Sequence, residues 1–385
     1  MMKNVLEIIN LSSSAINFIG GQFKYLHEDG GYEMHLICSP GGEIERFCQE
    51  NSVHYYPVEL RRQLSFFKDI KSFIKICRYI RQNKIDIVIA HQPKARLLAM
   101  FACMITGVKH RITFSHGILY ETMKGLKRWF VIFFEKIVSR LSTRVVCVSQ
   151  YVKNYRLSDK IDKEYKQVIL GRGSCNGIDT MNKFNPRLVD DNDIKDLRSR
   201  FGLDQNDFVV GFCGRLVRDK GVVELLSAFN ILVEQHPDMS IKLLVVGKSE
   251  NRDGLPQETL DTLNSGNGIV FSGAVSYSEI QNYYMLMNVL VLPSHRDGFG
   301  LVAIEASAME IPVLVSDYTG CRETILPGET GLYIGKDPWS IVKAVEVCFN
   351  IQYAKQLGRN GRQFVVENFE HTKVRTHVLN LLKSL

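Results

Sequence analysis

Short apolar runs rich in β-branched residues alternate with longer amphipathic stretches along the whole chain. The short runs predict strands, and apolar positions at helical spacing predict helices between them. In the first half of the chain the predicted strands are 5–9, 33–38, 85–90, 111–114, 144–148 and 167–170, and the clearest predicted helices are 66–81, 95–105 and 127–139. Strands that alternate with helices form βαβ units, so the pattern predicts a parallel sheet covered by helices on both faces.

The alternation pauses at 186–207, which is polar and charged and predicts a linker with one short helix. It restarts with predicted strands at 208–213, 242–246, 269–271, 289–292 and 313–316, and with predicted helices at 222–235, 277–284, 301–309, 341–349 and beyond Tyr353. The pattern therefore predicts two doubly wound, Rossmann-like α/β domains, residues 1–185 and 208–367, that face a cleft. We expect a C-terminal helix at about 368–385 to pack back on the first domain.

The composition is that of a globular protein. Of the 385 residues, 45% are apolar and 23% are charged, close to the averages for soluble domains. No apolar run approaches the roughly 18 residues of a membrane span, and the run at 5–9 is too short for a signal peptide and is interrupted by Glu7. The nine cysteines are an odd number without a CxxC pair, which argues against a disulfide framework or a structural zinc site and favours a reducing cytoplasm.

The charge is unevenly distributed. Residues 1–180 contain 27 Lys and Arg against 16 Asp and Glu, a net charge of +11, whereas the remainder has a net charge of −4. A basic first half suggests an anionic partner. Nucleic acid, anionic lipid and a phosphorylated substrate all fit this charge. No recognised nucleic-acid motif is present, so no nucleic-acid partner is expected.

Ligands of open parallel sheets bind beyond the carboxyl ends of the strands, and the first candidate junction of this kind follows strand 208–213. Gly214 allows a close backbone approach, and Arg215 and Lys220 bring two cations to the start of the next helix. Helix amides favour an anion there, so a diphosphate fits the arrangement. A tight βα turn with surface cations fits these residues equally well.

The second junction, after strand 289–292, is more specific. Asp297 precedes a Gly-Phe-Gly turn at 298–300, and Glu305 lies about one turn inside the helix that follows. The glycine amides can face a phosphate, and the carboxylates can face one ligand, one near a sugar and one near a ribose diol. The alternative makes Asp297 a helix cap and Glu305 a surface charge. The helix is mostly apolar, however, and a carboxylate in such surroundings needs a partner.

In their order and spacing these residues resemble the C-terminal domain of retaining, nucleotide-sugar-dependent glycosyltransferases of the GT-B fold, the large family 4. That family has a Gly-Arg…Lys-Gly turn, then a Glu-Gly-Phe-Gly-x-x-x-x-Glu block, then a Pro-Val strand. The chain matches with Gly214, Arg215, Lys220 and Gly221, with Asp297 through Glu305, with Pro312-Val313, and in position with 320–323 and 328–331. The resemblance covers most of 208–350.

The N-terminal half is more loosely similar to the capsule and O-antigen (CapM-like) subgroup of that family. The similarity rests on Phe114-Ser-His116-Gly117 with the basic helix after it, on 144–150 and on 171–186. The subgroup implies a polyprenyl-diphosphate-linked saccharide as acceptor and a UDP-sugar as donor. It further implies assembly of a bacterial surface polysaccharide by a peripheral protein on the inner face of the cell membrane.

The resemblance also implies roles for individual residues. Arg215 and Lys220 would hold the donor diphosphate, and Glu305 would accept hydrogen bonds from the ribose hydroxyls. Asp297 would contact the donor sugar, and His116 would reach that sugar from the other domain. The remaining donor contacts would come from Gly214, Gly273, Ala274, Val275, Gly298, Phe299, Gly300, Leu301 and Val302.

The chain departs from the family pattern at two places. Asp297 replaces the usual Glu and is one methylene shorter. The glycine pair that the family has after its first strand is absent, and that loop carries Ser12, Ser13 and Ser14 instead. Serine amides and hydroxyls can contact a phosphate there.

The expected reaction is a retaining transfer without a covalent intermediate. Double displacement needs a carboxylate nucleophile about 5 Å from an acid/base carboxylate, and no residue clearly supplies it. We expect attack on the face from which the nucleotide leaves, with the leaving phosphate taking the acceptor's proton while Arg215 and Lys220 stabilise its charge. His116 fits a general base or a hydrogen-bond partner of a sugar hydroxyl, and the second is favoured. No metal or other cofactor is required, and the Asp191-Asn-Asp193 string is expected to be a helix cap.

Two basic, aromatic segments, 124–144 and 61–84, predict contact with an anionic membrane. The alternative packs their apolar faces on the N-terminal sheet and leaves the cations in water. The apolar band of 124–144 is broader than packing needs, which favours the membrane there, whereas the preference for 61–84 is slight. The expected membrane residues are Lys124, Lys127, Arg128, Trp129, Phe130 and Phe133.

Three classes of function fit the pattern. The first is a retaining glycosyltransferase that moves a sugar, an N-acetylhexosamine or a related one, from UDP to the lipid-linked acceptor, with GDP-mannose as the rival donor. The second is another enzyme on the same fold, such as a sugar-nucleotide epimerase or a phosphorylase, although the cofactor-binding lysine of a phosphorylase is not evident. The third is a noncatalytic binding subunit, against which the set of Arg215, Lys220, Asp297 and Glu305 argues.

Overall fold

A computed structural model describes residues 2–60, 65–250 and 254–385, so residues 61–64 of the predicted basic segment 61–84 lie outside the described residues. The chain divides into two compact units. Unit 1 consists of Met1–Gly177 together with His371–Leu385, and unit 2 consists of Ile178–Glu370. Each unit contains one sheet whose strands all run parallel.

The sheet of unit 1 has seven strands in the order β3-β2-β1-β4-β5-β6-β7. Their bounds are β1 Lys3–Ile8, β2 Tyr32–Cys38, β3 His54–Pro57, β4 Ile87–His91, β5 His110–Ser115, β6 Arg144–Cys147 and β7 Gln167–Val168. The central strands are buried on both faces and are almost continuously apolar, as parallel strands between helices require. Glu7 in β1 is a conspicuous exception.

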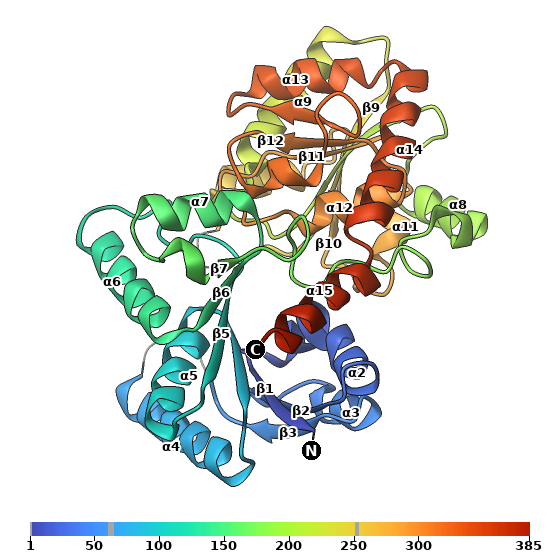
Figure 1. Ribbon diagram of the computed structural model, residues 1–385. Coiled ribbons are helices and arrows are strands. Elements are labelled where there is room, and N and C mark those ends of the chain that lie inside the picture. The colour runs from blue at the N-terminus through green and yellow to red at the C-terminus, as the bar shows by residue number, and fades with distance from the viewer. Residues whose placement is uncertain (1, 61–64, 251–253) are drawn as a thin grey trace. The chain divides into compact units, whose positions relative to one another are not determined.

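Helices cover both faces of this sheet (Figure 1): α2 and α3 lie on one side, and α4 and α5 lie on the other. Their bounds are α1 Ser12–Ser14, η1 Ala15–Ile19, α2 Gly20–Glu28, α3 Ile44–Glu50, α4 Phe66–Gln82, α5 Pro93–Thr106, α6 Gly125–Leu141, α7 Gln150–Ser158, η2 Glu164–Lys166 and α15 His371–Lys383. The last helix, α15, returns to pack on α2, where Thr376 bonds the Tyr25 hydroxyl at 2.9 Å.

The sheet of unit 2 has six strands in the order β10-β9-β8-β11-β12-β13. Their bounds are β8 Phe208–Cys213, β9 Ile241–Val246, β10 Ile269–Gly273, β11 Val289–Leu292, β12 Val313–Ser316 and β13 Leu332–Ile334. The helical segments around it are η3 Pro186–Leu188, α8 Asp191–Arg200, η4 Arg218–Lys220, α9 Val222–Gln235, α10 Gln257–Leu263, α11 Ile280–Tyr284, α12 Leu301–Ala308, η5 Gly320–Thr324, α13 Pro338–Val347 and α14 Ile351–Asn368. Helices α9 and α13 pack together on one face, and α12 and α14 pack together on the other (Figure 1).

Both sheets reverse their strand order once, between β1 and β4 in unit 1 and between β8 and β11 in unit 2. Connections leave in opposite directions on the two sides of such a point, which opens a crevice at the carboxyl ends of the strands. Ser12–Ser14, His116, Arg215, Lys220 and Asp297 follow strands at or beside these two points, whereas residues 273–275 lie at the end of the edge strand β10.

The predicted fold class of two parallel α/β domains is confirmed, and the predicted strands all form within a few residues of their expected ends. Strands β3 and β13 were not predicted. The expected helix at 277–284 begins later, at Ile280. Among the residues that the structure describes, no helix is both long enough and apolar enough to cross a membrane.

The unit boundaries lie at 177/178 and 370/371, whereas the sequence suggested 185, a linker at 186–207 and a domain end at 367. The reason is packing within unit 2. The Arg362 guanidinium on α14 donates to the carbonyl oxygens of Thr180, Phe184 and Ala308 at 3.1, 2.8 and 2.5 Å. The expected linker helix, α8, packs on α11, so its residues also belong to unit 2.

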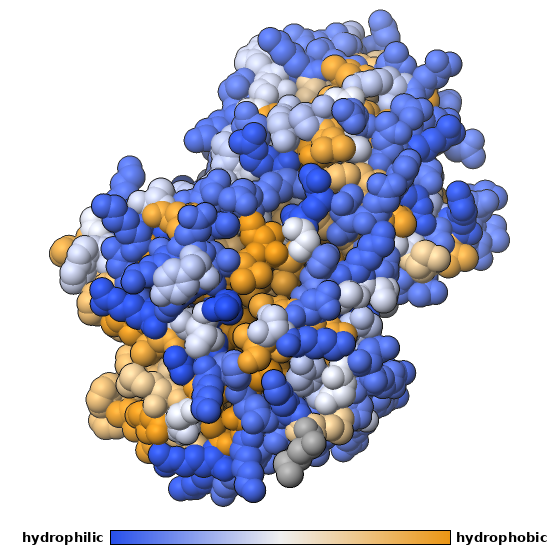
Figure 2. All heavy atoms as spheres, viewed as in Figure 1, coloured by the Kyte–Doolittle hydropathy of each residue, from blue (hydrophilic) through white to orange (hydrophobic). Residues whose placement is uncertain are grey.

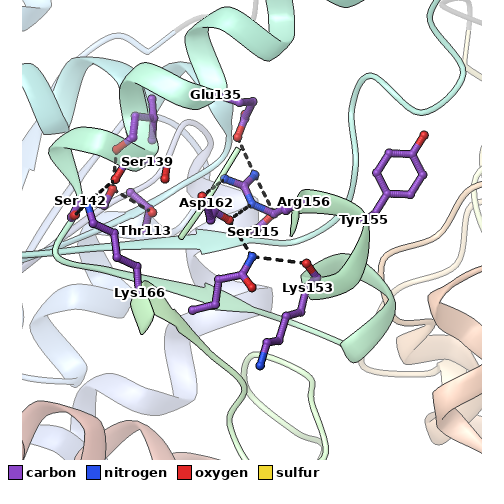
Figure 3. A network of polar contacts seen from close by, with 12 residues as sticks. Thr113, Ser115, Glu135, Ser139, Ser142, Lys153, Tyr155, Arg156, Asp162 and Lys166 are labelled. Carbon is purple, nitrogen blue, oxygen red and sulfur yellow. Dashed lines mark hydrogen bonds and ion pairs between the residues drawn. The ribbon is translucent and has the colours of Figure 1, made fainter. Parts of the chain in front are cut away.

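A buried cluster of charges holds α5, α6 and α7 on the sheet of unit 1, and Figure 3 shows the part of it around Arg156. Arg156 on α7 donates to Asp162 at 2.6 and 2.9 Å and to Glu135 on α6 at 2.7 Å. Arg96 on α5 donates to the other oxygen of Glu135 at 2.5 Å. Burial opposes ionisation of Glu135 and Asp162, but the guanidinium groups outweigh it and hold the pKa of each carboxyl below its ordinary value.

Removal of the central cation is expected to be costly. Arg156→Ala leaves Asp162 without its cation and leaves Glu135 with Arg96 alone, and should lower the free energy of unfolding by about 3–5 kcal/mol. Urea unfolding in a Trp339→Phe background measures this, because Trp129 then remains as the fluorescent reporter in unit 1. The matched control is Arg46→Ala, which removes an exposed ion pair with Glu50 and should change the value by less than about 1 kcal/mol. Equal effects of the two substitutions would contradict the assignment.

Candidate functional site

The carboxyl edge of unit 2 carries glycines where the backbones of three strands converge. Gly214 follows β8, Gly247 follows β9 and Gly273 ends β10. Gly247 N donates to Gly273 O at 2.9 Å, and a Cβ on Gly247 would stand 1.7 Å from Gly214 O. Only glycine fits that approach. Gly247 was not predicted, although a glycine directly after an apolar strand was the available signal.

Lys220 and Asp297 form an ion pair on the two sides of the strand reversal in unit 2. Lys220 ends the short helical turn after β8, and Asp297 lies in the loop after β11. Burial raises the pKa of Asp297, but Lys220 outweighs it and the net shift is downward. Burial lowers the pKa of Lys220, but Asp297 outweighs burial and the net shift of that pKa is upward. Both groups are therefore charged. The sequence argument treated them as separate contacts, and the structure joins them.

Arg215 stands beside this pair without joining it. Its Nη1 lies 3.2 Å from Glu250 Oε2, and more than half of its side chain is exposed. Its charge is nevertheless close enough to oppose protonation of Lys220. Lys220 is therefore a cation fixed by Asp297, and Arg215 is an exposed cation at the same edge of the sheet.

Glu305 is buried on α12 and has the partner that its apolar surroundings require. The Tyr284 hydroxyl donates to it at 2.7 Å and the Tyr277 hydroxyl at 3.4 Å. Lys183 lies with Nζ 2.9 Å from the centre of the Tyr277 ring. Burial raises the pKa of Glu305 to about 7, and it lowers the pKa of Lys183 to about 8. A surface role for Glu305 is thereby excluded.

The turn between Asp297 and α12 is held by the backbone. Gly300 caps α12 with φ of +93°, a conformation that favours glycine. Gly320 N donates to Asp297 O at 2.9 Å, and the ring of Phe299 packs on Phe369 with centroids 5.3 Å apart. These contacts fix the loop that carries Asp297. Leu301 and Val302 form the first turn of α12, and Ala274 and Val275 directly follow β10.

His116 in unit 1 heads a chain of buried polar groups that the sequence did not reveal. Its Nε2 lies 2.9 Å from His91 Nδ1, and His91 Nε2 lies 2.7 Å from Glu7 Oε2. His91 ends β4, and Glu7 lies in β1. The signal in the sequence was Glu7 itself, a charged residue inside an apolar strand.

The serine loop of unit 1 forms a short helical turn, α1, separated from the end of β1 by three residues. Gln92, after β4, joins it to the neighbouring loop: its Nε2 donates to Ser14 Oγ at 3.3 Å, and its Oε1 accepts from Asn10 N at 3.1 Å. Ser12 and Ser13 share this turn with Ser14. The turn lies at the reversal between β1 and β4, where a ligand is expected.

Helix α6 presents aromatic side chains to solvent. Trp129, Phe130 and Phe133 are 63%, 50% and 45% exposed, and Leu126, which was not predicted, is 86% exposed. Orange spheres interrupt the blue surface at the lower left of Figure 2, where Figure 1 places α4, α5 and α6. The prediction that the apolar band of 124–144 exceeds what packing covers is confirmed.

One member of the expected membrane set is engaged within the fold. Arg128 Nη2 donates to both carboxylate oxygens of Asp159, at 2.9 and 2.7 Å, and its guanidinium lies 5.6 Å from the centre of the Tyr120 ring. Lys124 and Lys127, by contrast, are exposed. On α4 the described exposed apolar residues are Phe66, Phe67, Ile70 and Ile74.

All nine cysteines lie in the described residues as thiols. No group of three or more His, Cys, Asp or Glu side chains within the described ranges is arranged to hold a metal ion. The string Asp191-Asn-Asp193 opens α8, but Asp190 supplies the cap, because its side chain accepts from Asn192 N at 2.8 Å. The predicted location of the string in a helix start is right, and the capping residue was one position off.

Two family matches cover the chain in succession. Residues 19–167 match the glycosyl transferase 4-like domain, and residues 193–364 match glycosyl transferases group 1. Over 96% of its length the chain is 32% identical to the capsular polysaccharide biosynthesis glycosyltransferase CapM of Staphylococcus aureus, of which it covers 94%. The chain is a family 4 glycosyltransferase. It belongs to the capsule-related subgroup that includes CapM.

Two further proteins support the assignment. The glycosyltransferase is 24% identical over 89% of its length to the UDP-Gal:alpha-D-GlcNAc-diphosphoundecaprenol alpha-1,3-galactosyltransferase of Escherichia coli, of which it covers 86%. Its fold matches Anabaena HepE, solved in complex with UDP and glucose, with a TM-score of 0.79, 17% identity and full coverage of both chains. The GT-B architecture is thereby shown.

In this glycosyltransferase the predicted site residues form two groups. Unit 2 brings together Lys220 and Asp297, with Arg215 beside them, and it surrounds Glu305 with Tyr277, Tyr284 and Lys183, which sequence reasoning missed. Unit 1 joins His116 to His91 and Glu7, also missed. Tyr284 ends α11 and Tyr277 lies in the turn before it. Nothing in the sequence pairs them with Glu305, which follows them by 21 and 28 residues.

The raised pKa of Glu305 predicts how stability depends on pH. Between the ordinary value of 4.5 and about 7 the native state keeps a proton that the unfolded state loses, so the free energy of unfolding falls as pH rises through this window. Glu305→Gln should remove that fall, which is about 3 kcal/mol at most. Urea unfolding from pH 4 to 8 in a Trp129→Phe background, with Trp339 reporting unit 2, measures it. A difference between the proteins that stays constant with pH would refute the burial of an ionisable Glu305, and the exposed Glu258→Gln serves as control.

Proposed function

We propose that the protein is a retaining glycosyltransferase that moves a sugar from a UDP-sugar to a polyprenyl-diphosphate-linked saccharide during assembly of a bacterial surface polysaccharide such as a capsule. The observation that carries the proposal is the presence of two charged sites at the strand reversal in unit 2. An ammonium–carboxylate pair, Lys220–Asp297, meets the needs of a diphosphate and a sugar. The buried carboxylate of Glu305, on the helix after the same loop, meets those of a ribose diol.

The electrostatics fit a nucleotide-sugar that leaves a charged product. Lys220 is held as a cation by Asp297 and Arg215 lies nearby, so charge that develops on a departing diphosphate meets one fixed cation and a second, exposed one. Gly214 and the glycines of the 298–300 turn have no side chains, so their backbone amides can approach the same phosphate. The UDP in the HepE complex supports a uridine nucleotide, and so does the name of the Escherichia coli relative.

The proposed transfer proceeds on one face of the sugar. The bond between the anomeric carbon and the β-phosphate oxygen breaks while the acceptor hydroxyl forms its bond from the same side, so the configuration is retained. The acceptor proton passes to the departing phosphate oxygen, which makes a separate protein base unnecessary. Asp297, held as an anion by Lys220, is suited to accept from sugar hydroxyls. The scheme assigns no step to a metal ion.

The acceptor is proposed from the surface of unit 1. The exposed aromatic residues of α6, flanked by Lys124 and Lys127, suit an anionic membrane interface. An apolar hollow of about 400 Å³ near the start of α6 is lined by Met123, Leu126, Lys127, Phe130 and Val131. A lipid-linked acceptor would be met at such a surface. We therefore propose a peripheral position on the inner face of the cell membrane.

The nucleotide is the first point to test. Calorimetric titration with UDP, GDP, ADP and dTDP should show selective binding of UDP, lost in Glu305→Ala because the ribose contact is removed. Glu305→Gln keeps the shape of the side chain and separates charge from packing. Selective GDP binding would move the donor to a GDP-sugar such as GDP-mannose, and binding of none of the four would overturn the proposed activity.

Turnover tests the phosphate assignment. Lys220→Ala should lower the rate of transfer by about 2–4 kcal/mol of transition-state stabilisation, roughly 30- to 1000-fold. Lys355→Ala, an exposed lysine on α14, serves as the matched control and should keep the wild-type rate. If Lys220→Ala also transfers sugar at the wild-type rate, the diphosphate lies elsewhere.

Membrane contact has its own experiment. Replacement of Trp129, Phe130 and Phe133 by Ser should release the protein from anionic liposomes in a flotation assay, with the affinity for UDP unchanged. The control is Trp339→Ser, a residue of unit 2 that is 51% exposed. Continued binding of the triple variant would mean that another surface, such as that of α4, makes the contact.

A further inference from the structure

Glu7, His91 and His116 form a buried chain of hydrogen-bonding groups that runs from Glu7 outward to His116. Glu7 Oε2, His91 Nε2, His91 Nδ1 and His116 Nε2 are linked by contacts of 2.7 Å and 2.9 Å. Glu7 and His91 are almost fully buried, whereas His116 is partly exposed. Within the described part of the chain no hydrogen-bond partner of His116 Nδ1 is found, so this nitrogen is the outer end of the chain.

The register of the sheet explains why the three groups meet. Glu7 is opposite Ile89 on β4, and residues two apart on a strand share a face, so His91 lies on the same face as Glu7. His91 is opposite Phe114 on β5, whose ring stacks on His91 and His116 with centroids 4.8 and 5.9 Å away. Both imidazoles are thereby held in one orientation.

A neutral imidazole donates at one nitrogen and accepts at the other, so a proton fixed at one end of such a chain sets the whole sequence of hydrogen bonds. Burial raises the pKa of Glu7 well above its ordinary value. Burial also lowers the pKa of His91 to about 3 and lowers that of His116. The uncharged forms are therefore favoured. The Glu7 carboxyl donates to His91 Nε2, and His91 Nδ1–H donates to His116 Nε2.

If the proton moves from Glu7 to His91, His91 donates at both nitrogens. His116 Nε2 then still accepts from His91, and His116 Nδ1 still carries the hydrogen. Only an ionised Glu7 with a neutral His91 would reverse the direction, and burial opposes that uncompensated charge. The charged group that acts on both histidines is Arg96, which donates to Glu135 at 2.5 Å. The thiol of Cys175 lies close to Glu7 and is uncharged, because burial raises its pKa to about 12.

We propose that Glu7 and His91 are positioning residues that fix the tautomer of His116, so that Nε2 accepts from His91 and Nδ1 carries the hydrogen as an outward donor. For the reaction, this inference rests on the proposed function. His116 Nδ1–H is then available as a donor to a sugar oxygen, and the ring has no free lone pair with which to act as a general base.

The tautomer can be observed without any substrate. Protein labelled with ¹⁵N-histidine gives two-bond ¹H–¹⁵N correlations that distinguish a protonated ring nitrogen from a bare one, and the His116→Gln spectrum assigns the signals. We expect His116 to be protonated at Nδ1 in the wild type. Glu7→Leu should give a mixture of tautomers. Glu7→Gln should keep the wild-type tautomer, because its amide can donate in place of the carboxyl.

Two further variants cover the cases in which Glu7→Leu does not fold or in which loss of any buried side chain alters the His116 signals. His91→Phe breaks the chain at its middle and answers the same question if Glu7→Leu does not fold. His35→Phe removes another buried histidine of this sheet, bonded to Tyr79 at 2.9 Å, and should leave the His116 signals unchanged. Protonation of wild-type His116 at Nε2, or unchanged signals in both Glu7→Leu and His91→Phe, would overturn the proposal.

Kinetics separate this inference from the proposed function. Loss of such an orienting partner should lower kcat by about 10- to 100-fold in Glu7→Leu, with the affinity for UDP unchanged. Failure of the wild type to bind UDP would refute the proposed donor and leave the tautomer result standing. A wild-type kcat in Glu7→Leu with an altered tautomer would refute the catalytic consequence.

Discussion

The cost of burying charge governs the arrangement at the carboxyl edges of both sheets. A charged or polar group inside a protein is tolerated only with a partner that replaces water. Each half of the molecule meets this requirement in its own way. Unit 2 pairs Lys220 with Asp297 and surrounds Glu305 with phenols, and unit 1 pairs Arg156 with two carboxylates and joins Glu7 to two imidazoles. Because these partners come from different strands and helices, satisfying them fixes the loops that a ligand would meet.

The same requirement relates the inner and outer sides of α6. Its inner side carries Glu135, locked to Arg96 and Arg156, and its C-terminal carbonyls at 139, 140 and 142 accept hydrogen bonds from Lys166. Its outer side carries Trp129 and Phe133, whose stacked rings lie in solvent. A helix that is anchored by buried charge can display an apolar surface without collapsing that surface onto the sheet. The anchor thus makes the exposed face possible.

Much of this could be predicted from sequence, and the limits are instructive. The strands, the helices and the order of the unit 2 motifs follow from local periodicity, which the chain shows clearly. The need of Glu305 for a partner also followed from its apolar neighbours. Which partner it has did not, because Tyr284 reaches it only through the packing of α11 on α12. The Lys220–Asp297 pair and the Glu7–His91–His116 chain depend on strands that are adjacent in space but distant in sequence, and a single sequence holds no record of that adjacency. The boundary at 177/178 was missed for the same reason, since Arg362 binds carbonyls almost 180 residues earlier.

The return of α15 to unit 1 has a consequence for biosynthesis. During translation, residues 1–177 leave the ribosome first, yet the helix that covers α2 follows only after all of unit 2 has emerged. Unit 2 is continuous and can complete its fold while unit 1 still lacks a covering helix. While almost 200 further residues are synthesised, the nascent chain therefore exposes the apolar surface of unit 1 that Val374, Val378 and Leu382 later cover. The order in which the two halves mature is the reverse of the order in which they are made.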